Sequence, residues 1–128
     1  MVLDSQVRST MVPPTSLARK LVDGGPGGLE ELRVQEFPDE ESAHDDALHA
    51  RLHAEFSAEF DRVQAELART YGEPLRTGAG DDDLIPLDGV FRFALWEVGD
   101  LVLFAAAAHE DRDCPLLLML GTTGGDGA

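Results

Sequence analysis

The chain has 128 residues, enough for one domain with a single modest hydrophobic core. Its 25 acidic residues against 10 basic ones give a formal net charge of −15, which opposes binding to nucleic acid or to an anionic membrane and favours a basic partner. The single cysteine, Cys114, excludes an internal disulfide and is typical of a protein of the reducing cytoplasm.

The N-terminal third predicts short elements. Residues 1–15 show no hydrophobic period, so we expect a flexible arm or an edge segment there, and no signal peptide. Residues 16–22 fit either a helix capped by Ser16 or a strand joined across GGPGG to the next element. The run LEELRVQEF, residues 29–37, alternates as a strand does.

A long amphipathic helix follows. Asp39 or Ser42 is a good N-cap, and Gly72 followed by Pro74 ends the helix. The helix would run for about 30 residues, or break near Ala43. Its apolar residues recur at steps of three and four, as one helical face requires: Leu48, Leu52, Phe56, Phe60, Val63 and Leu67.

The remaining chain predicts a loop over 72–89 and then three strands, 90–98, 101–109 and 116–122, with a two-residue turn at Gly99-Asp100. We therefore expect an α+β fold, in which one long amphipathic helix packs on an antiparallel sheet with a C-terminal three-stranded meander. The expected organisation is a flexible N-terminal arm (1–15), a single domain (16–122) and a disordered tail (123–128). The longest apolar runs are too short to span a bilayer.

The three C-terminal strands carry apolar residues on both faces. We expect Phe91, Phe93 and Leu95 on one face of their strand and Val90 and Trp96 on the other. A sheet with one solvated face would alternate with polar residues instead. One helix covers one face only, so the N-terminal segment, a second copy or another protein must cover the other. We expect a homodimer or a hetero-complex.

The stretch HDDALHARLHAEF, residues 44–56, raises the question of a metal site. His49 and His53 have the spacing of a clasping pair and Asp45 would add a ligand, but a site needs a further ligand. His44 falls on another side of the helix. We expect no metal and no cofactor, with His49 partly buried and hydrogen-bonded and His53 solvated.

The acidic residues are candidates for binding a protein partner. The candidates lie on the long helix and in the glycine-rich loop after it: Glu55, Glu59, Asp61, Asp81, Asp82 and Asp83. The loop acids lack the alternation of a calcium-binding loop. A row of alanines on the same helix fits either a contact surface or simply a good helix former: Ala47, Ala50, Ala54, Ala58, Ala65 and Ala68.

No motif for catalysis is found. GGPGG is not a phosphate-binding loop, no Gly-x-Ser-x-Gly is present, and the charge opposes a nucleic-acid surface. We therefore expect a non-enzymatic protein-binding module. The alternative is a small-molecule-binding protein or enzyme, with a pocket between helix and sheet lined by His49, Tyr71, Trp96 and His109. A third possibility is a DNA-mimic inhibitor, although its acids would need regular rows.

The chain resembles a known type of small protein in the order of three features. They are a helix ending Leu67-x-x-x-Tyr71-Gly72-x-Pro74, a strand with Trp96, and Gly99-Asp100 between apolar strands. It looks like small uncharacterised actinobacterial proteins and like immunity proteins encoded beside polymorphic toxins. The resemblance covers residues 48–122. It implies a protein that binds a protein partner, and it offers no catalytic residues to carry over to this chain. The scarcity of lysine and asparagine fits a GC-rich, actinobacterial genome.

Overall fold

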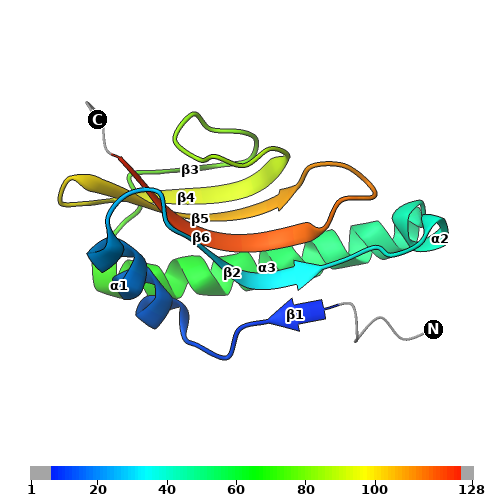
Figure 1. The fold of residues 1–128 in the computed structure, drawn as a ribbon, viewed down its shortest axis with the longest axis horizontal. Coiled ribbons are helices and arrows are strands. Elements are labelled where there is room, and N and C mark those ends of the chain that lie inside the picture. Colours follow the sequence, from blue (N-terminus) through cyan, green and yellow to red (C-terminus); the bar gives the residue numbers. More distant parts are fainter. Residues whose placement is uncertain (1–6, 125–128) are drawn as a thin grey trace.

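A computed structural model describes residues 7–124 as one antiparallel sheet with helices on one face (Figure 1). The six strands lie in the order β1-β2-β6-β5-β4-β3. The elements in chain order are β1 (Val7–Ser9), α1 (Pro14–Gly24), β2 (Leu29–Gln35), α2 (Glu40–Ala43), α3 (Asp46–Tyr71), β3 (Arg76–Gly78), β4 (Val90–Val98), β5 (Leu101–His109) and β6 (Leu116–Gly124). The predicted α+β class, with a long helix and a C-terminal meander β4-β5-β6, is confirmed.

Helix α3 runs along the length of the sheet, with α1 beside its C-terminal half (Figure 1). The predicted apolar face is the buried one, and Phe56, Phe60 and Leu67 are wholly inaccessible to solvent. They pack against Trp96 of β4 and against the small side chains on this face of β5. Burying these side chains stabilises the fold by about 1.5–3 kcal/mol each.

The long helix is broken at His44, close to the break expected near Ala43. The carboxylate of Asp39 caps α2 by accepting from the Ser42 N–H at 2.7 Å. The carboxylate of Asp45 caps α3 in the same way, accepting from the Leu48 N–H at 3.0 Å. Two side chains that favour a helix start, six residues apart, therefore produce a short helix and a 26-residue helix instead of one continuous helix.

Residues 14–24 form a helix, which decides between the two alternatives for 16–22. Pro14 stands in its first turn, where the missing N–H costs nothing. Strand β2 ends at Gln35, two residues before the expected end, and Phe37 turns into the core. Strand β1 lies within the segment assigned to the arm, and β6 continues to Gly124. Residues 1–6 and 125–128 of the expected arm and tail lie outside the described residues.

The expected loop over 72–89 contains a strand, β3, which pairs with β4 at the edge of the sheet. The rest of that loop folds over the face of the sheet opposite the helices. Its residue Ile85 is buried there against Val90, Phe93, Leu95, Val102, Phe104, Ala106 and Ala108. This second core covers the apolar face of β4 and β5 from within the chain. We expected that cover to come from the N-terminal segment, a second copy or another protein, and residues of the 72–89 loop provide it instead.

A bulge at the start of β4 changes the expected facing of its side chains. The register with β5 shifts between Val90 and Arg92, so the strict alternation of the strand is interrupted. As a result Val90 packs in the second core with Phe93, while Phe91 packs against the helix side. The expectation that Phe91 faces with Phe93, and Val90 with Trp96, is wrong for this reason.

None of the helices among residues 7–124 combines the length and the apolar character that crossing a bilayer requires.

Candidate functional site

Three histidines and two phenylalanines form one cluster of rings, which we call the histidine stack: Phe37, His49, His53, Phe91 and His109. His49 lies between Phe37 and His109, with ring centroids 4.3 Å and 5.2 Å away. His109 lies 5.0 Å from His53, which stacks on Phe91 at 4.5 Å. The rings thus come from α3, from the ends of β4 and β5, and from the segment after β2.

Local geometry explains this meeting. His49 and His53 are four residues apart, so both lie on the face of α3 that turns to the sheet. In β5, Leu103, Ala105 and Ala107 face α3, and alternation places His109 on the same side. The exposed His44 is not part of the stack. His49 is buried and hydrogen-bonded as expected, whereas His53 is half-buried and bonded to another ring instead of solvated.

The hydrogen bonds define where the protons lie in the neutral stack. His49 Nε2 is 3.0 Å from the carbonyl oxygen of Ser42, and His109 Nε2 is 3.0 Å from that of Cys114. A carbonyl only accepts, so both nitrogens carry hydrogen. The other nitrogen of neutral His109, Nδ1, is then an acceptor, and His53 Nε2 donates to it at 2.9 Å.

The surroundings of two of these rings disfavour the charged form. Burial lowers the pKa of His53, and a charge on His49 would lower it further. Burial also lowers the pKa of His109, followed by the effect of its two histidine neighbours. The bond to the Cys114 carbonyl and the charge of Asp111 oppose that shift without cancelling it. Both rings are therefore neutral at neutral pH.

The predicted metal candidates do not form a ligand set. His49 donates to a backbone carbonyl, His53 donates to another ring, and the Asp45 carboxylate caps α3. Within residues 7–124, no group of three or more histidine, cysteine or acidic side chains is arranged to hold a metal ion.

The histidine stack lies under the most acidic part of the molecule, which we call the acidic end: residues 36–46 and 110–113. These two segments carry nine carboxylates and one arginine, a net charge of −8 out of the chain's −15. They meet through the stacking of Phe37 on His109 and through an ion pair between Arg112 and Asp46. Figure 1 shows α2 and the β5–β6 connection at the same end of the molecule.

Seven of the nine carboxylates of the acidic end fall into two groups. Asp39, Asp45 and Asp111 each accept a bond from a nearby backbone N–H, and the bond from Ser42 lowers the pKa of Asp39. These three hold local structure. A second group is exposed at the surface and caps neither helix: Glu40, Glu41, Glu110 and Asp113.

Most of the acids predicted as partner-binding residues contact basic or backbone groups of the same chain. Arg33, which projects from β2, binds Glu59 at 3.0 Å and Glu55 at 3.4 Å. Asp61 pairs with Arg92.

The loop acids are engaged in a similar way. Asp82 binds Arg76 through two nitrogens, at 3.0 and 3.1 Å, and Asp81 accepts from the Val90 N–H at 3.0 Å. Asp83 is exposed. Asp81 and Asp82 therefore connect elements of the fold, as Glu55, Glu59 and Asp61 do. The acidic end, which the sequence analysis did not select, holds more of the exposed charge.

The four residues predicted to line one pocket lie at two separate places. His49 and His109 touch in the histidine stack. Trp96 lies near the C-terminal end of α3, where its indole N–H donates to the carbonyl of Gly72 at 2.9 Å, next to Tyr71. Trp96 is 1% exposed, so it is a core residue that anchors the helix end.

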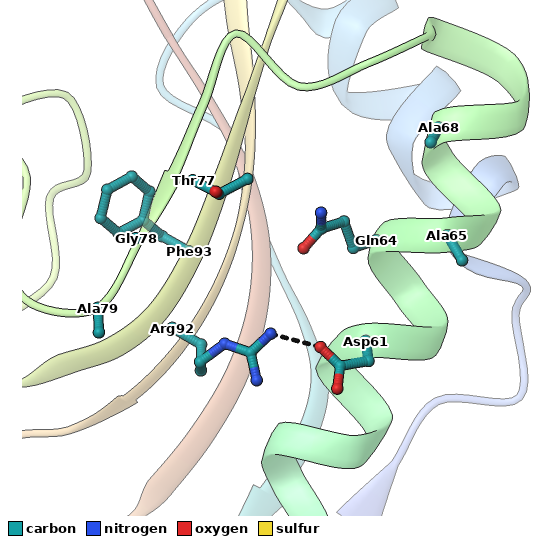
Figure 2. A pocket seen from close by; sticks show the side chains of 9 residues that line it. All are labelled: Asp61, Gln64, Ala65, Ala68, Thr77, Gly78, Ala79, Arg92 and Phe93. Atoms are coloured by element: carbon teal, nitrogen blue, oxygen red, sulfur yellow. Dashed lines mark hydrogen bonds and ion pairs between the residues drawn. The ribbon is translucent and has the colours of Figure 1, made fainter.

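A groove does exist between helix and sheet, with other residues. It has a volume of about 390 Å³ and lies between the C-terminal half of α3 and the β3–β4 edge (Figure 2). Figure 2 shows Gln64 and Thr77 pointing toward each other across it, with the Arg92–Asp61 ion pair at one end. Ala65 and Ala68, from the predicted alanine row, form part of its wall.

The chemical capacity of these sites is limited. Burial and the nearby Asp113, Glu110 and Asp111 raise the pKa of Cys114, so this cysteine is a thiol and a poor nucleophile. The histidine stack can accept and share protons, yet two of its three Nε2–H groups are bound to backbone carbonyls. The acidic end can attract cationic groups, and the groove presents an amide, a hydroxyl and an ion pair.

Comparison of the chain with protein-family models, with curated proteins and with solved structures finds no match in any of the three.

Proposed function

We propose that the protein is a non-enzymatic binding module that recognises a basic protein partner through its acidic end. One observation carries this proposal: more than half of the net charge lies in two short segments, 36–46 and 110–113, which the fold brings together. Such a concentrated field steers a cationic partner and speeds association, and salt weakens its effect.

Four exposed acids are the residues to test: Glu40, Glu41, Glu110 and Asp113. They can lose their charge without removing a helix cap, because Asp39 and Asp45 supply the caps of α2 and α3. Exposed substitutions of this kind change stability by about 0.5 kcal/mol or less each. A loss of binding in these variants would therefore report on recognition and not on folding.

The experiment compares two fourfold variants that remove the same charge. The first neutralises the acidic end with E40Q, E41Q, E110Q and D113N. The matched control neutralises four exposed acids elsewhere, with E73Q, D88N, E97Q and D100N. Affinity capture from extracts of the source cell, followed by mass spectrometry, supplies the partner, and calorimetry then measures the dissociation constant at 50 and 300 mM salt.

We expect the acidic-end variant to bind the captured partner at least tenfold more weakly, and the control at most threefold more weakly. Tenfold corresponds to about 1.4 kcal/mol, which a few neutralised contacts at a surface can supply. An equal loss of affinity in both variants would mean that binding depends on the total charge and not on the acidic end. Capture of no basic partner at either salt concentration would contradict the proposal.

The groove of Figure 2 supports a second candidate function, binding of a small polar molecule. Its volume of about 390 Å³ is within the range of small-molecule sites. The substitution A68R would place a long side chain in the groove, and A58R makes the same change at an exposed alanine that is not in its lining. A ligand whose affinity falls in A68R and not in A58R would favour this second function.

The finer expectations from the sequence belong to this proposal as well. We infer an immunity-type or adaptor role in the cytoplasm, supported by the acidic surface and by the single, thiol-form Cys114. The homodimer also stays a prediction, although the loop cover over the second face of the sheet removes the main reason for it.

A further inference from the structure

The histidine stack connects the acidic end to the body of the molecule. The ring of His49 donates to the carbonyl of Ser42 in α2, and the ring of His109 donates to the carbonyl of Cys114 in the β5–β6 turn. Both segments of the acidic end are therefore tied to α3 and β5 through imidazole rings. An ion pair between Arg112 and Asp46 also connects the turn to the start of α3.

One added proton is compatible with this arrangement. In the neutral pair, His53 Nε2 donates to His109 Nδ1 across 2.9 Å. A proton on His53 Nδ1 leaves that bond in place. A proton on His109 Nδ1 is also accommodated, if His53 moves its own proton to Nδ1 and accepts through Nε2. A singly charged pair therefore keeps one strong, charge-assisted hydrogen bond.

A second proton is not compatible with it. When His53 and His109 are both charged, two N–H donors face each other at the 2.9 Å contact and no acceptor remains between them. The two cations would also lie with ring centroids 5.0 Å apart, in a half-buried place. The rings of His53 and His109 must then move apart. Because His109 also stacks on His49 and on Phe37, its displacement disturbs the two rings that bond to Ser42 and Cys114.

Other charged groups surround the stack and set the pH at which this occurs. Asp111, in the turn, favours the charged form of His109. The rest of the turn adds Glu110, Asp113 and the thiol of Cys114, with Arg112 paired to Asp46. From the helical side, the nearby acids are those of residues 36–46: Glu36, Asp39, Glu40, Glu41, Asp45 and Asp46. On β4, the Arg92 next to Phe91 is turned to Asp61 on α3.

We propose that the histidine stack is a pH-sensitive latch, which holds α2 and the β5–β6 turn against the core when it is neutral or singly charged and releases them when His53 and His109 are both protonated. That the release would regulate partner binding rests on the proposed function. The release itself depends only on the stack. Acidification therefore loosens the two segments that form the acidic end, while the sheet and the rest of α3 stay folded.

Backbone ¹⁵N relaxation of the whole chain at pH 7.5 and at pH 5.0 tests the latch. We expect order parameters near 0.85 throughout the folded region at the higher pH, and below about 0.6 for residues 39–46 and 110–114 at the lower pH. The amides of β4 and β5 serve as the internal reference and should not change. A uniform fall across the chain, or no fall at the acidic end, would overturn the proposal.

Two glutamine variants separate the stack from acidification in general. In H53Q the side-chain amide still donates to His109, but the pair can carry only one charge, so the acidic end should stay ordered at pH 5.0. H44Q replaces an exposed histidine outside the stack. In this variant the acidic end should loosen at pH 5.0 as much as it does in the unmodified chain. Loosening in H53Q equal to that in H44Q would contradict the latch.

If H53Q does not fold, titration of the histidine rings of the unmodified chain by NMR tests the latch instead. The latch requires that His53 and His109 both become protonated only where the order parameters of the acidic end have fallen. Double protonation of an acidic end that stays ordered would refute it. Neither measurement uses a partner, so failure to capture a basic protein would contradict the proposed function and leave the latch standing.

Discussion

Replacing His109 by phenylalanine tests the role that we give to the hydrogen bonds of the histidine stack. The substitution keeps a ring of similar shape between His49 and His53. It removes two hydrogen bonds, one at 3.0 Å to the carbonyl of Cys114 and one at 2.9 Å from His53 Nε2. The packing of the stack is thus largely preserved while its polar connections are lost.

The size of the effect follows from the contacts. A neutral hydrogen bond contributes about 1 kcal/mol to stability, so losing two lowers the free energy of unfolding by about 2 kcal/mol. His109 is half-buried, and water can reach part of the vacated space and satisfy the carbonyl of Cys114. We therefore expect the substitution to lower the free energy of unfolding by about 1–3 kcal/mol at pH 8, where His53 and His109 are neutral in both the folded and the unfolded chain.

The difference in free energy of unfolding between the unmodified protein and H109F should shrink as the pH falls. The pKa of His109 is lowered in the folded state, so below about pH 6.5 the unfolded chain binds more protons than the folded one. The unmodified protein loses stability from this group as the pH falls from 6.5 to the folded-state pKa. The phenylalanine variant has no such group, and its His53 has one histidine neighbour fewer.

Urea denaturation followed by circular dichroism measures both quantities. With a slope of roughly 2 kcal/mol per molar urea, a loss of 2 kcal/mol moves the midpoint by about 1 M at pH 8. The control H44Q should stay within about 0.5 kcal/mol of the unmodified protein at pH 8 and at pH 5.5. A stability difference for H109F that is absent at pH 8, or that grows on acidification, would refute the reasoning.

Three further predictions concern the fold and the assembly. The variant G89A should lose more than about 2 kcal/mol, because Gly89 has a φ of 72° and an added Cβ would lie 2.4 Å from the His109 carbonyl oxygen. G80A, at a φ of 111° with no atom within 4 Å, should lose clearly less, and chemical denaturation of both variants checks this order. W96F should lose about 1–2 kcal/mol with the hydrogen bond to Gly72, seen as a lower thermal midpoint. Sedimentation at micromolar concentration checks the expected homodimer, and a 13.8 kDa species at both low and high salt would exclude it.

Local patterns were sufficient to predict the long helix, whereas they left residues 16–22 open between a helix and a strand. The apolar spacing from Leu48 to Leu67 defines one buried face, and the acidic side chains near Ala43 account for the break between α2 and α3. Both signals act within a few residues of the chain. The strands of the meander were predictable for the same reason, since the turn at Gly99-Asp100 separates two apolar runs.

The facing of residues in β4 was not predictable from alternation. The bulge between Val90 and Arg92 depends on the turn at Gly89, whose carbonyl accepts a bond from the His109 N–H at 2.9 Å. That contact joins positions far apart in sequence. Strand β3 was missed because Arg76–Gly78 is short and carries no apolar period, and it exists only because β4 offers an edge for pairing.

The histidine stack was half visible in the sequence. The four-residue spacing puts His49 and His53 on neighbouring positions of one side of α3, although His53 was expected to be solvated. Alternation along β5 gives the side of His109. Which end of β5 meets which turn of α3 depends on how the helix crosses the sheet, and no local pattern specifies that. No local pattern specifies the ion pairs of Arg33 and Arg92 either. These arginines pair with Glu55, Glu59 and Asp61, which were predicted to bind a partner.

Mapping the captured partner onto the ¹⁵N-labelled chain by NMR tests the central claim most directly. With the partner added at pH 7.5 and 50 mM salt, we predict that the largest shifts fall in residues 39–46 and 110–114 and disappear at 300 mM salt. Shifts concentrated around Asp61, Gln64 and Arg92 in the groove, with the acidic end unchanged, would contradict the account.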